Sequence, residues 1–534
     1  MNRRKSVMVH SFAQIPNATI PRSQFNRSHG YKTAFNSGYL VPIYVDECLP
    51  GDTFNLKMHA FARMATPITP VMDNVFLETF FFAVPLRLVW SNFKKFMGEQ
   101  ATPASSISYV CPTITSPVNG WTVGSLSDYL GLPTVGQVAG GNTTTSVSFW
   151  HRAYNLIWNE WFRDENIQDS VTVDTGDGPD TAANYVLLRR GKRHDYFTTA
   201  LPWPQKGSTA VSLPLAGNAP ITGIGVKDGI SGFGSEAGVN ETGTTTGITY
   251  TNAGLTTNVA TWAIKTAGAG PDTQPQIYAN LSAVTAATIN QLRQSIATQQ
   301  LLERDARGGT RYTEIIRSHF GVTSPDARLQ RPEYLGGGVS MVNFHPVQQN
   351  SPTSGSNALG QLAAFATAGV SGHGFVKSFT EHCVLIGLAN VRADLNYQQG
   401  QDKMFDRSTR YDFYWPTFAN LGEQTVLNKE IYADGSANDA VVFGYQERYA
   451  EYRYKPSKIT GIMRSTAAST VDVWHLAQKF TAAPTLNTTF ISDTPPISRV
   501  MAVSSQPEFI FDAYFDLKCA RPMPVYSVPG LTRL

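Results

Sequence analysis

Hydrophobic and polar residues alternate strictly over a dozen positions just after residue 50. The apolar positions of this stretch are Phe54, Leu56, Met58, Ala60, Ala62 and Met64. The residues between them are polar, and Phe61 is the one exception. A period of two is typical of a strand with one buried face, so the pattern predicts a long half-buried strand starting at Asp52. The same alternation over residues 509–519 makes that segment its clearest pairing partner.

Further short segments have the hydrophobic character of strands. They cover residues 75–83, 384–391, 441–454 and 471–480. Strands come from both ends of the chain, and no regular succession of helices separates them. This arrangement favours antiparallel Greek-key pairing over βαβ winding, so we predict a mainly β fold.

Helical periodicity occurs in segments that we expect to be insertions between strands. The predicted helices follow Pro85, follow Ser148, cover residues 284–307, and run through Phe320 to a stop at Gly321. In the third helix Ile289, Leu292 and Ile296 are expected to face inward. Apolar stripes of this kind are more typical of core packing than of a cofactor site.

The length and composition agree with a β-rich chain that carries long insertions. The chain has 534 residues, and a single hydrophobic core rarely grows past about 250–300 residues. Charged residues make up 16% of it, against about 25% in an average soluble protein. Helix-rich proteins use many Glu, Lys and Arg residues, so the low charge favours strands.

The composition also divides the chain. Residues 1–46 contain no acidic residue before Asp46, and we expect them to form an extended basic arm. We expect residues 47–534 to form the main domain. Within it, residues 205–283 are rich in Gly, Thr, Ala and Asn, with few charges. We expect this insertion to be a surface subdomain of short strands, because a structureless loop of such length is uncommon; disorder is the alternative.

Nothing in the sequence predicts export or a membrane span. No apolar region follows the basic N-terminus, and charged residues and a proline interrupt the most apolar stretch, residues 75–90. Cysteines are widely scattered, at Cys48, Cys111, Cys383 and Cys519. We therefore expect reduced and mostly buried thiols, made in a cytoplasm.

The search for catalytic and metal-binding motifs returns almost nothing. The sequence has no phosphate-binding loop, no HExxH and no GxSxG, and Ser371 lacks the second glycine of such an elbow. His373, His382 and Cys383 are the nearest approach to a metal set, but neighbours on a strand face opposite sides. We predict no enzymatic activity, no metal and no cofactor. A carboxylate pair for glycoside hydrolysis stays open, because such pairs meet only in space.

Basic residues carry more information. We predict nucleic-acid contacts at Arg3, Arg4, Lys5, Arg22, Arg27 and Lys32. Aromatic residues are spaced between these cations, and this combination can neutralise phosphates and stack bases without reading sequence. An arm that packs on a neighbouring subunit is the equal alternative. A second basic cluster, residues 189–194, is expected to be a solvated face or an ion-paired turn.

Long stretches of the sequence resemble a known family. The stretches are PRSQFNRSHGYKTAFN (21–36), LVPIYVDECLPGDTF (40–54), PLRLVWSNFKKFMGE (85–99), FGVTSPDARLQRPEYLGG (320–337), FHPVQQNSPTSGSNALGQLAAFAT (344–367) and YAEYRYKPSKITG (449–461). They resemble the major capsid protein of small single-stranded DNA bacteriophages, and more narrowly the gokushovirus branch of the Microviridae. The resemblance covers most of the chain outside residues 205–283.

The resemblance implies an eight-stranded antiparallel jelly roll with long insertions that contain several helices. About sixty copies would close an icosahedral shell around circular single-stranded DNA, after assembly in the bacterial cytoplasm. The implied partners are a small basic DNA-binding protein, an internal scaffolding protein, a pilot protein and a host-cell receptor. An insertion in that branch forms a protrusion at the three-fold axes. On that basis Phe233, Tyr250 and Trp262 are candidate receptor or three-fold contacts.

Two other classes of protein remain as alternatives. A secreted β-sandwich carbohydrate-binding protein or glycosidase would share the Thr- and Gly-rich loops, but we would expect a signal peptide. A basic-armed nucleic-acid-binding protein is the other, but the net charge of +3 is small for a protein whose main partner is DNA.

Overall fold

The computed structural model describes most of the chain in two compact units. The described residues are 22–100, 102, 108–207, 221–222, 224–227, 236–237, 261–265, 278–279, 289–309, 311–322, 330–350 and 360–526. One unit comprises Met1–Pro204 with Gly308–Leu534, and the other is Gln205–Arg307. The second unit begins where the composition changes and also includes most of helix α5 (Ile289–Gly308).

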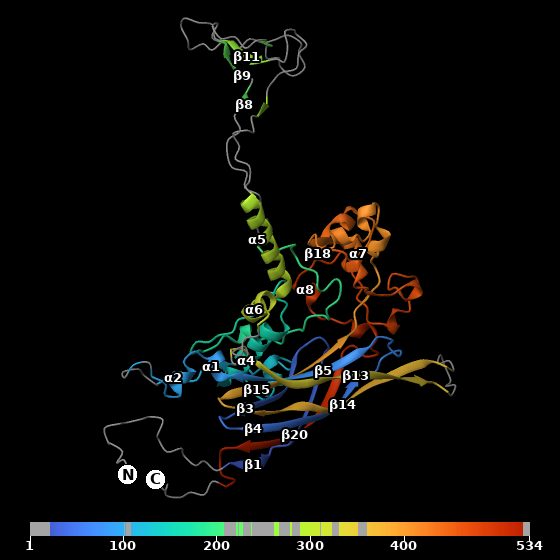
Figure 1. Cartoon of the computed structure of the whole chain (residues 1–534). Coiled ribbons are helices and arrows are strands. Elements are labelled where there is room, and N and C mark those ends of the chain that lie inside the picture. Colours follow the sequence, from blue (N-terminus) through green and yellow to red (C-terminus); the bar gives the residue numbers. More distant parts are fainter. Residues whose placement is uncertain are drawn as a thin grey trace, which may run out of the picture. The chain divides into compact units, whose positions relative to one another are not determined.

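The first unit is built on a sandwich of eight long strands (Figure 1). In chain order these are β2 (His29–Phe35), β3 (Val41–Cys48), β4 (Thr53–Met64), β5 (Val75–Pro85), β13 (Glu333–Gln348), β14 (Leu362–Ser378), β15 (Cys383–Ala393) and β20 (Phe509–Arg521). One layer has the order β2-β20-β4-β14 and the other β3-β15-β5-β13, and every pairing is antiparallel. The ends of β13 and β14 pair with each other and join the layers. This topology confirms the jelly roll.

The two segments with the clearest alternation lie side by side, as predicted. Strand β4 pairs with β20 along its whole length, for example Ala62 with Phe511. Every second side chain of β20 from Phe509 to Cys519 is buried, and Phe61 on β4 is 52% exposed. Their buried faces form the centre of the sandwich core.

Part of the predicted arm belongs to this sheet. From Ser23 onward the segment forms β1 (Ser23–Asn26), β2 and β3, and both β1 and β2 pair with β20. Residues 1–21 lie outside the described residues.

Helical insertions cover the outer side of the β3-β15-β5-β13 layer. The helix predicted after Pro85 is two short helices, α1 (Leu86–Val89) and α2 (Phe93–Phe96). The helix predicted after Ser148 is α4 (Phe149–Ile157), which continues as a π-helical turn, Trp158–Phe162. The side chain of Ser148 makes no cap bond and donates instead to the carbonyl of Pro112. These elements pack with Phe82 and Ile386 in a second core.

The two later helices also form, with one correction. Helix α6 (Tyr312–Phe320) ends at Gly321, whose φ of 69° is left-handed. Helix α5 is described from Ile289 onward, and residues 284–288 of the predicted helix lie outside the described residues. The expectation that Ile289, Leu292 and Ile296 face inward is wrong for the single chain, because they are 70%, 42% and 50% exposed.

The connection between β15 and β20 is the least regular part of the sandwich unit. Its main elements are β17 (Glu423–Leu427), α7 (Asn428–Ile431), β18 (Val442–Glu447) and α8 (Thr488–Ile491), and a third small core lies among them. The strand predicted over residues 441–454 is β18, which ends at Glu447 and is shorter than expected. The strand predicted over 471–480 is wrong, since a 3₁₀ turn forms at Asp472–Trp474. The backbone of that segment bonds to loop partners, as when Leu476 N–H donates to Asp73.

Short strands are present in the second unit, as predicted for the low-charge insertion. Strand β11 (Thr261–Lys265) pairs with β9 (Ile224–Lys227) and β10 (Glu236–Ala237), and β8 (Ile221–Thr222) pairs with β12 (Tyr278–Ala279). Trp262 lies on β11, while Phe233 and Tyr250 lie outside the described residues.

Glycines allow the two layers to meet where β13 crosses β14. A Cβ added at Gly336 on β13 would overlap the carbonyl oxygen of Gly374 on β14. Gly374 also lies close to β4, its neighbour in the same layer, because a Cβ added there would overlap the carbonyl oxygen of Leu56. Next to this crossing a bulge turns His373 inward, where its Nδ1 lies 2.9 Å from Thr79 Oγ1 on the opposite layer. The close approach of the backbones explains why small residues are needed here.

Replacing Gly374 with alanine is expected to destabilise the chain by at least about 2 kcal/mol, because backbone atoms cannot move aside as a side chain can. Gly369→Ala, on the same strand, is the matched control because no atom lies near its added Cβ. Denaturant unfolding of the unassembled subunit measures both changes. Equal stability of the two variants would show that the close contact of Gly374 with the backbone of Leu56 does not require a glycine.

Candidate functional site

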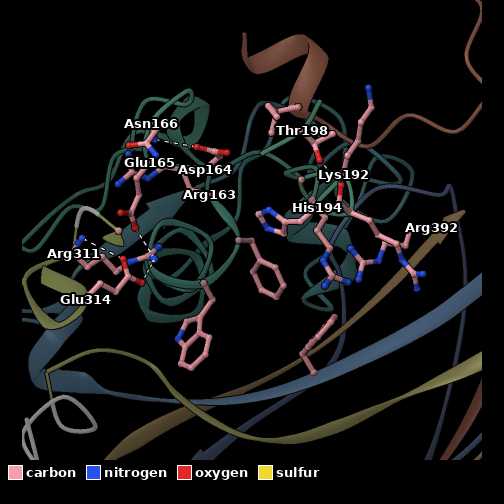
Figure 2. Close-up of a pocket in the computed structure, with 18 of the residues that line it drawn as sticks. Arg163, Asp164, Glu165, Asn166, Lys192, His194, Thr198, Arg311, Glu314 and Arg392 are labelled. Atoms are coloured by element: carbon pink, nitrogen blue, oxygen red, sulfur yellow. Dashed lines mark hydrogen bonds and ion pairs between the residues drawn. The ribbon is translucent and has the colours of Figure 1, made fainter. Parts of the chain in front are cut away.

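A pocket of about 690 Å³ opens on the outer side of the β3-β15-β5-β13 layer (Figure 2). Its floor is aromatic: Phe80 and Phe82 come from β5, Tyr334 from β13, and Trp161 and Phe162 from the π-helical turn. Phe82 packs against three of these rings, with centroids 5.6–5.9 Å apart. Alternation on β5 turns Phe80 and Phe82 away from the sandwich core, which brings them to this side.

One end of the pocket holds a carboxylate among arginines. Glu78 is 3% exposed and forms ion pairs with three arginines: Arg190, Arg392 at 2.9 Å and Arg193 at 3.5 Å. Burial alone would raise the pKa of Glu78, but Arg190 and Arg392 hold it below its ordinary value. Arg193 also binds Asp394 at 2.8 Å. The positive charges outnumber the carboxylates at this end.

The other end reverses the arrangement. Arg311, at the start of α6, lies among Glu160, Glu165 and Glu314 at 3.4, 2.6 and 3.1 Å. Figure 2 shows Glu165 and Glu314 with Arg311 on one side of the pocket and Arg392 with Lys192 on the other. Glu78 and Arg311 are thus each neutralised by opposite charges, whereas the buried Lys192 donates to the side-chain amide oxygen of Gln478 at 2.7 Å.

These ion pairs hold separate elements of the fold together. Glu78 on β5 holds the loop of residues 190–193 against the sheet, and Arg311 holds α6 against the end of α4. The same loop is fixed further by Arg189, whose guanidinium lies 3.9 Å from the ring centre of Tyr39. The ion-paired turn predicted for residues 189–194 is confirmed. The sequence did not reveal its partner Glu78, which lies more than 100 residues away in the chain.

The predicted nucleic-acid residues that are described lie along the edge of the β2-β20-β4-β14 layer. Arg27 binds Asp46 at 2.7 Å and Lys32 binds Asp512 at 2.8 Å. Arg22 donates to the hydroxyl of Thr53. Arg3, Arg4 and Lys5 lie outside the described residues. Contact of any of these residues with nucleic acid stays a prediction.

One serine–histidine pair resembles part of a hydrolase triad, but its geometry does not suit catalysis. Ser127 Oγ lies 2.9 Å from His151 Nε2, and both side chains are 1% exposed. His151 Nδ1 has no hydrogen-bond partner, so no carboxylate orients the ring. A substrate has no access to the hydroxyl. The pair is part of the packing around α4.

Among the described residues, the thiols and candidate metal ligands are likewise not arranged for catalysis or metal binding. Cys48, Cys383 and Cys519 are buried, Cys111 is half-buried, and all four are free thiols as predicted. Burial raises the pKa of Cys383 to about 12, which makes it an unreactive thiol. Among the described residues, no three His, Cys, Asp or Glu side chains are placed to hold a metal ion. Nor does that part of the chain contain a helix suited to crossing the bilayer.

A jelly roll with large insertions is a fold of viral shell proteins and also of lectins and cupins, and in this chain the charged clusters hold its own elements together. The chain matches the family model described as capsid protein (F protein) over residues 13–531, so it belongs to this capsid-protein family. The named residues of the pocket and the sandwich all fall within the match. The resemblance found in the sequence is confirmed.

Curated relatives agree over almost their whole length, and each is named capsid protein VP1. The protein of Bdellovibrio phage phiMH2K is 49% identical over 98% of this chain and 97% of its own. That of Chlamydia phage 1 is 44% identical over 99% of both chains. That of Spiroplasma virus 4 is 36% identical over 98% of both. The chain is thus a structural protein of the virion, and the secreted β-sandwich alternative is not favoured.

Burial of neutral His151 predicts a specific loss of stability in acid. Burial lowers the pKa of His151 to about 4 from 6.5, so between these values the unfolded chain binds a proton that the folded chain does not. Stability falls as the pH drops through this window, by up to about 3 kcal/mol from this group.

The measurement compares unfolding of unassembled wild-type, His151→Gln and His345→Gln subunits at pH 7 and pH 4.5. His345 is exposed and serves as the control. The acid-induced loss should be smaller in His151→Gln and unchanged in His345→Gln. Identical losses in all three proteins would contradict the assignment.

Proposed function

We propose that about sixty copies of the chain close an icosahedral shell around a circular single-stranded DNA genome. Genome binding is proposed from the exposed face of the β2-β20-β4-β14 layer. Phe61 and Tyr514 are each 52% exposed there. On the same face the exposed cations Lys57, Arg63 and Lys518 form no ion pair with any described residue. Exposed rings beside free cations suit single-stranded nucleic acid, which needs stacking and charge but no base readout.

The N-terminal arm belongs to the same proposal. The described chain starts at Arg22 and enters β1, which pairs with β20 at the edge of this layer. In the shell this face lies inside, and Arg3, Arg4 and Lys5 bind phosphate. A small basic DNA-binding protein, an internal scaffolding protein and a pilot protein would share this interior, in line with the family resemblance.

Replacing Arg3, Arg4 and Lys5 with alanine should weaken binding of unassembled subunits to single-stranded DNA and lower the salt dependence. Each lost phosphate contact reduces the slope of log K against log salt by about 0.7, so the triple variant should lose about 2. The control replaces Lys94, Lys95 and Lys479, which are exposed elsewhere. An unchanged slope in the arm variant, measured by fluorescence titration, would refute the DNA role of the arm.

We also propose that residues 205–283 project from the shell and attach it to a host-cell receptor. The insertion has too few large apolar residues for a core of its own, and strand pairs as short as β8–β12 are unstable alone. The exposed Ile289, Leu292 and Ile296 of α5 would pack against the same residues of copies around a three-fold axis. Phe233, Tyr250 and Trp262 are the candidate contacts with those copies or with the receptor.

Replacing residues 223–261 with a short Gly/Ser linker tests shell assembly and host attachment separately. Shells should still form, because the sandwich and α5 remain, but adsorption to host cells should fall at least tenfold. Electron microscopy counts particles and a cell-binding assay counts adsorption. The Trp262→Ala variant tests whether a single aromatic residue carries part of the effect. Undiminished adsorption by the deleted particles would eliminate the attachment role.

A further inference from the structure

An exposed aromatic patch lies in the connection between β15 and β20, away from the pocket of Figure 2. It consists of Phe405, Tyr411, Phe413, Tyr414, Trp415 and Tyr452, which are 47–67% exposed. Soluble proteins rarely leave so many large rings together at the surface unless another molecule covers them.

The patch is rigid. Asp412 accepts hydrogen bonds from the backbone of Ser408 and Thr409 at 3.0 and 2.7 Å and closes the 3₁₀ turn of Arg410–Asp412. Trp415 Nε1 donates to the carbonyl of Arg410 at 2.8 Å. Because the polar tip is already bonded, the ring face is presented to a partner with little loss of conformational entropy.

Three of the rings, Phe413, Tyr414 and Tyr452, are linked around Arg407. Its guanidinium lies 4.5 Å from the ring centre of Tyr452 and 5.2 Å from that of Phe413. Tyr414 adds an edge contact with Tyr452, with ring centroids 6.3 Å apart. Tyrosine, tryptophan and arginine are the residues that most often anchor protein–protein contacts.

Many cations at this surface are already paired. Five of them lie against carboxylates of the same region: Lys403 with Glu430, Arg407 with Glu451, Lys429 with Asp406, Arg453 with Glu447, and Lys458 with Asp402. Paired cations release few counterions when DNA approaches, so these five add little to phosphate binding. Arg410 and Arg448 form no ion pair with a described residue and lie instead against the rings of Tyr411 and Tyr449.

A small pocket at the edge of the patch sets the size of what it accepts. Met404, Arg407, Tyr452 and Tyr454 contribute to its lining, and its volume is about 180 Å³. Pockets for small-molecule ligands usually measure about 300–1,000 Å³, so this one suits a single large side chain. Half-exposed rings of this number also offer about 600 Å² of apolar surface, most of the ~800 Å² that each partner contributes to a standard interface.

We infer that this aromatic patch is a contact surface between copies of the chain, and that its small pocket receives one apolar side chain of the neighbouring copy. The inference rests on the shell proposed above, in which every subunit must be held by its neighbours. It adds the location of one such contact, on the β15–β20 connection.

The test uses the full chain with Phe405 and Phe413 both replaced by serine. Both side chains are exposed, so the unfolding midpoint of the subunit should stay within about 2 °C of wild type. The yield of shells, counted by electron microscopy, should fall at least tenfold. Phe320→Ser, which removes an exposed phenylalanine of α6, should assemble normally.

Hydrogen exchange provides a readout that needs no variant. In wild-type shells the amides of residues 405–415 should exchange at least tenfold more slowly than in free subunits. Wild-type shells with unchanged exchange at the patch, or normal shells from the double variant, overturn the inference alone. Protection of the patch in free subunits by a single-stranded oligonucleotide or a polysaccharide also overturns it. Failure of the wild-type chain to form any shell overturns the proposed function as well.

Discussion

The two-sided burial of β5 and β15, the central strands of the β3-β15-β5-β13 layer, is the constraint on which the rest of the structure depends. All but two residues of β5, and all but one of β15, are buried. One face of these strands fills the sandwich core, and the other, with Phe82 and Ile386, needs a second cover. The insertion helices supply it, and the ion pairs of Glu78 and Arg311 fix them in place. A chain without these insertions would expose an apolar sheet face to water.

The opposite layer has only one buried face. Its other face is exposed and is free to contact other molecules. Its outer side carries exposed rings and cations, which a chain stabilising itself has no reason to display together. The β15–β20 connection and helix α5 likewise expose apolar side chains. The inner elements of the subunit are therefore satisfied within one chain, whereas the surfaces that remain exposed are those proposed above to contact the genome, neighbouring subunits and the host.

Sequence patterns located the strands that obey local rules. Strands β4 and β20 alternate strictly because each has one buried face, and both were predicted nearly to their ends. Strand β13 was missed because Gly336 and its glycine neighbours suggest a loop, although they are there for the crossing with β14. The false strand over residues 471–480 has the right composition, but its backbone bonds to distant loops. The pocket was invisible in the sequence because Glu78 and Arg311 reach their partners only through the fold. Likewise, the inward face predicted for α5 assumed a partner that a single chain does not provide.

We propose that the chain is a subunit whose exposed surfaces are completed by copies of itself. Mass measurement of the purified protein under assembly conditions, by light scattering or native mass spectrometry, tests it most directly. The subunit has a mass of 58.4 kDa. The account predicts closed particles of about sixty copies, on the order of 3.5 MDa, with few intermediates. A stable monomer at high concentration, in the presence of its scaffolding protein and of single-stranded DNA, would contradict it.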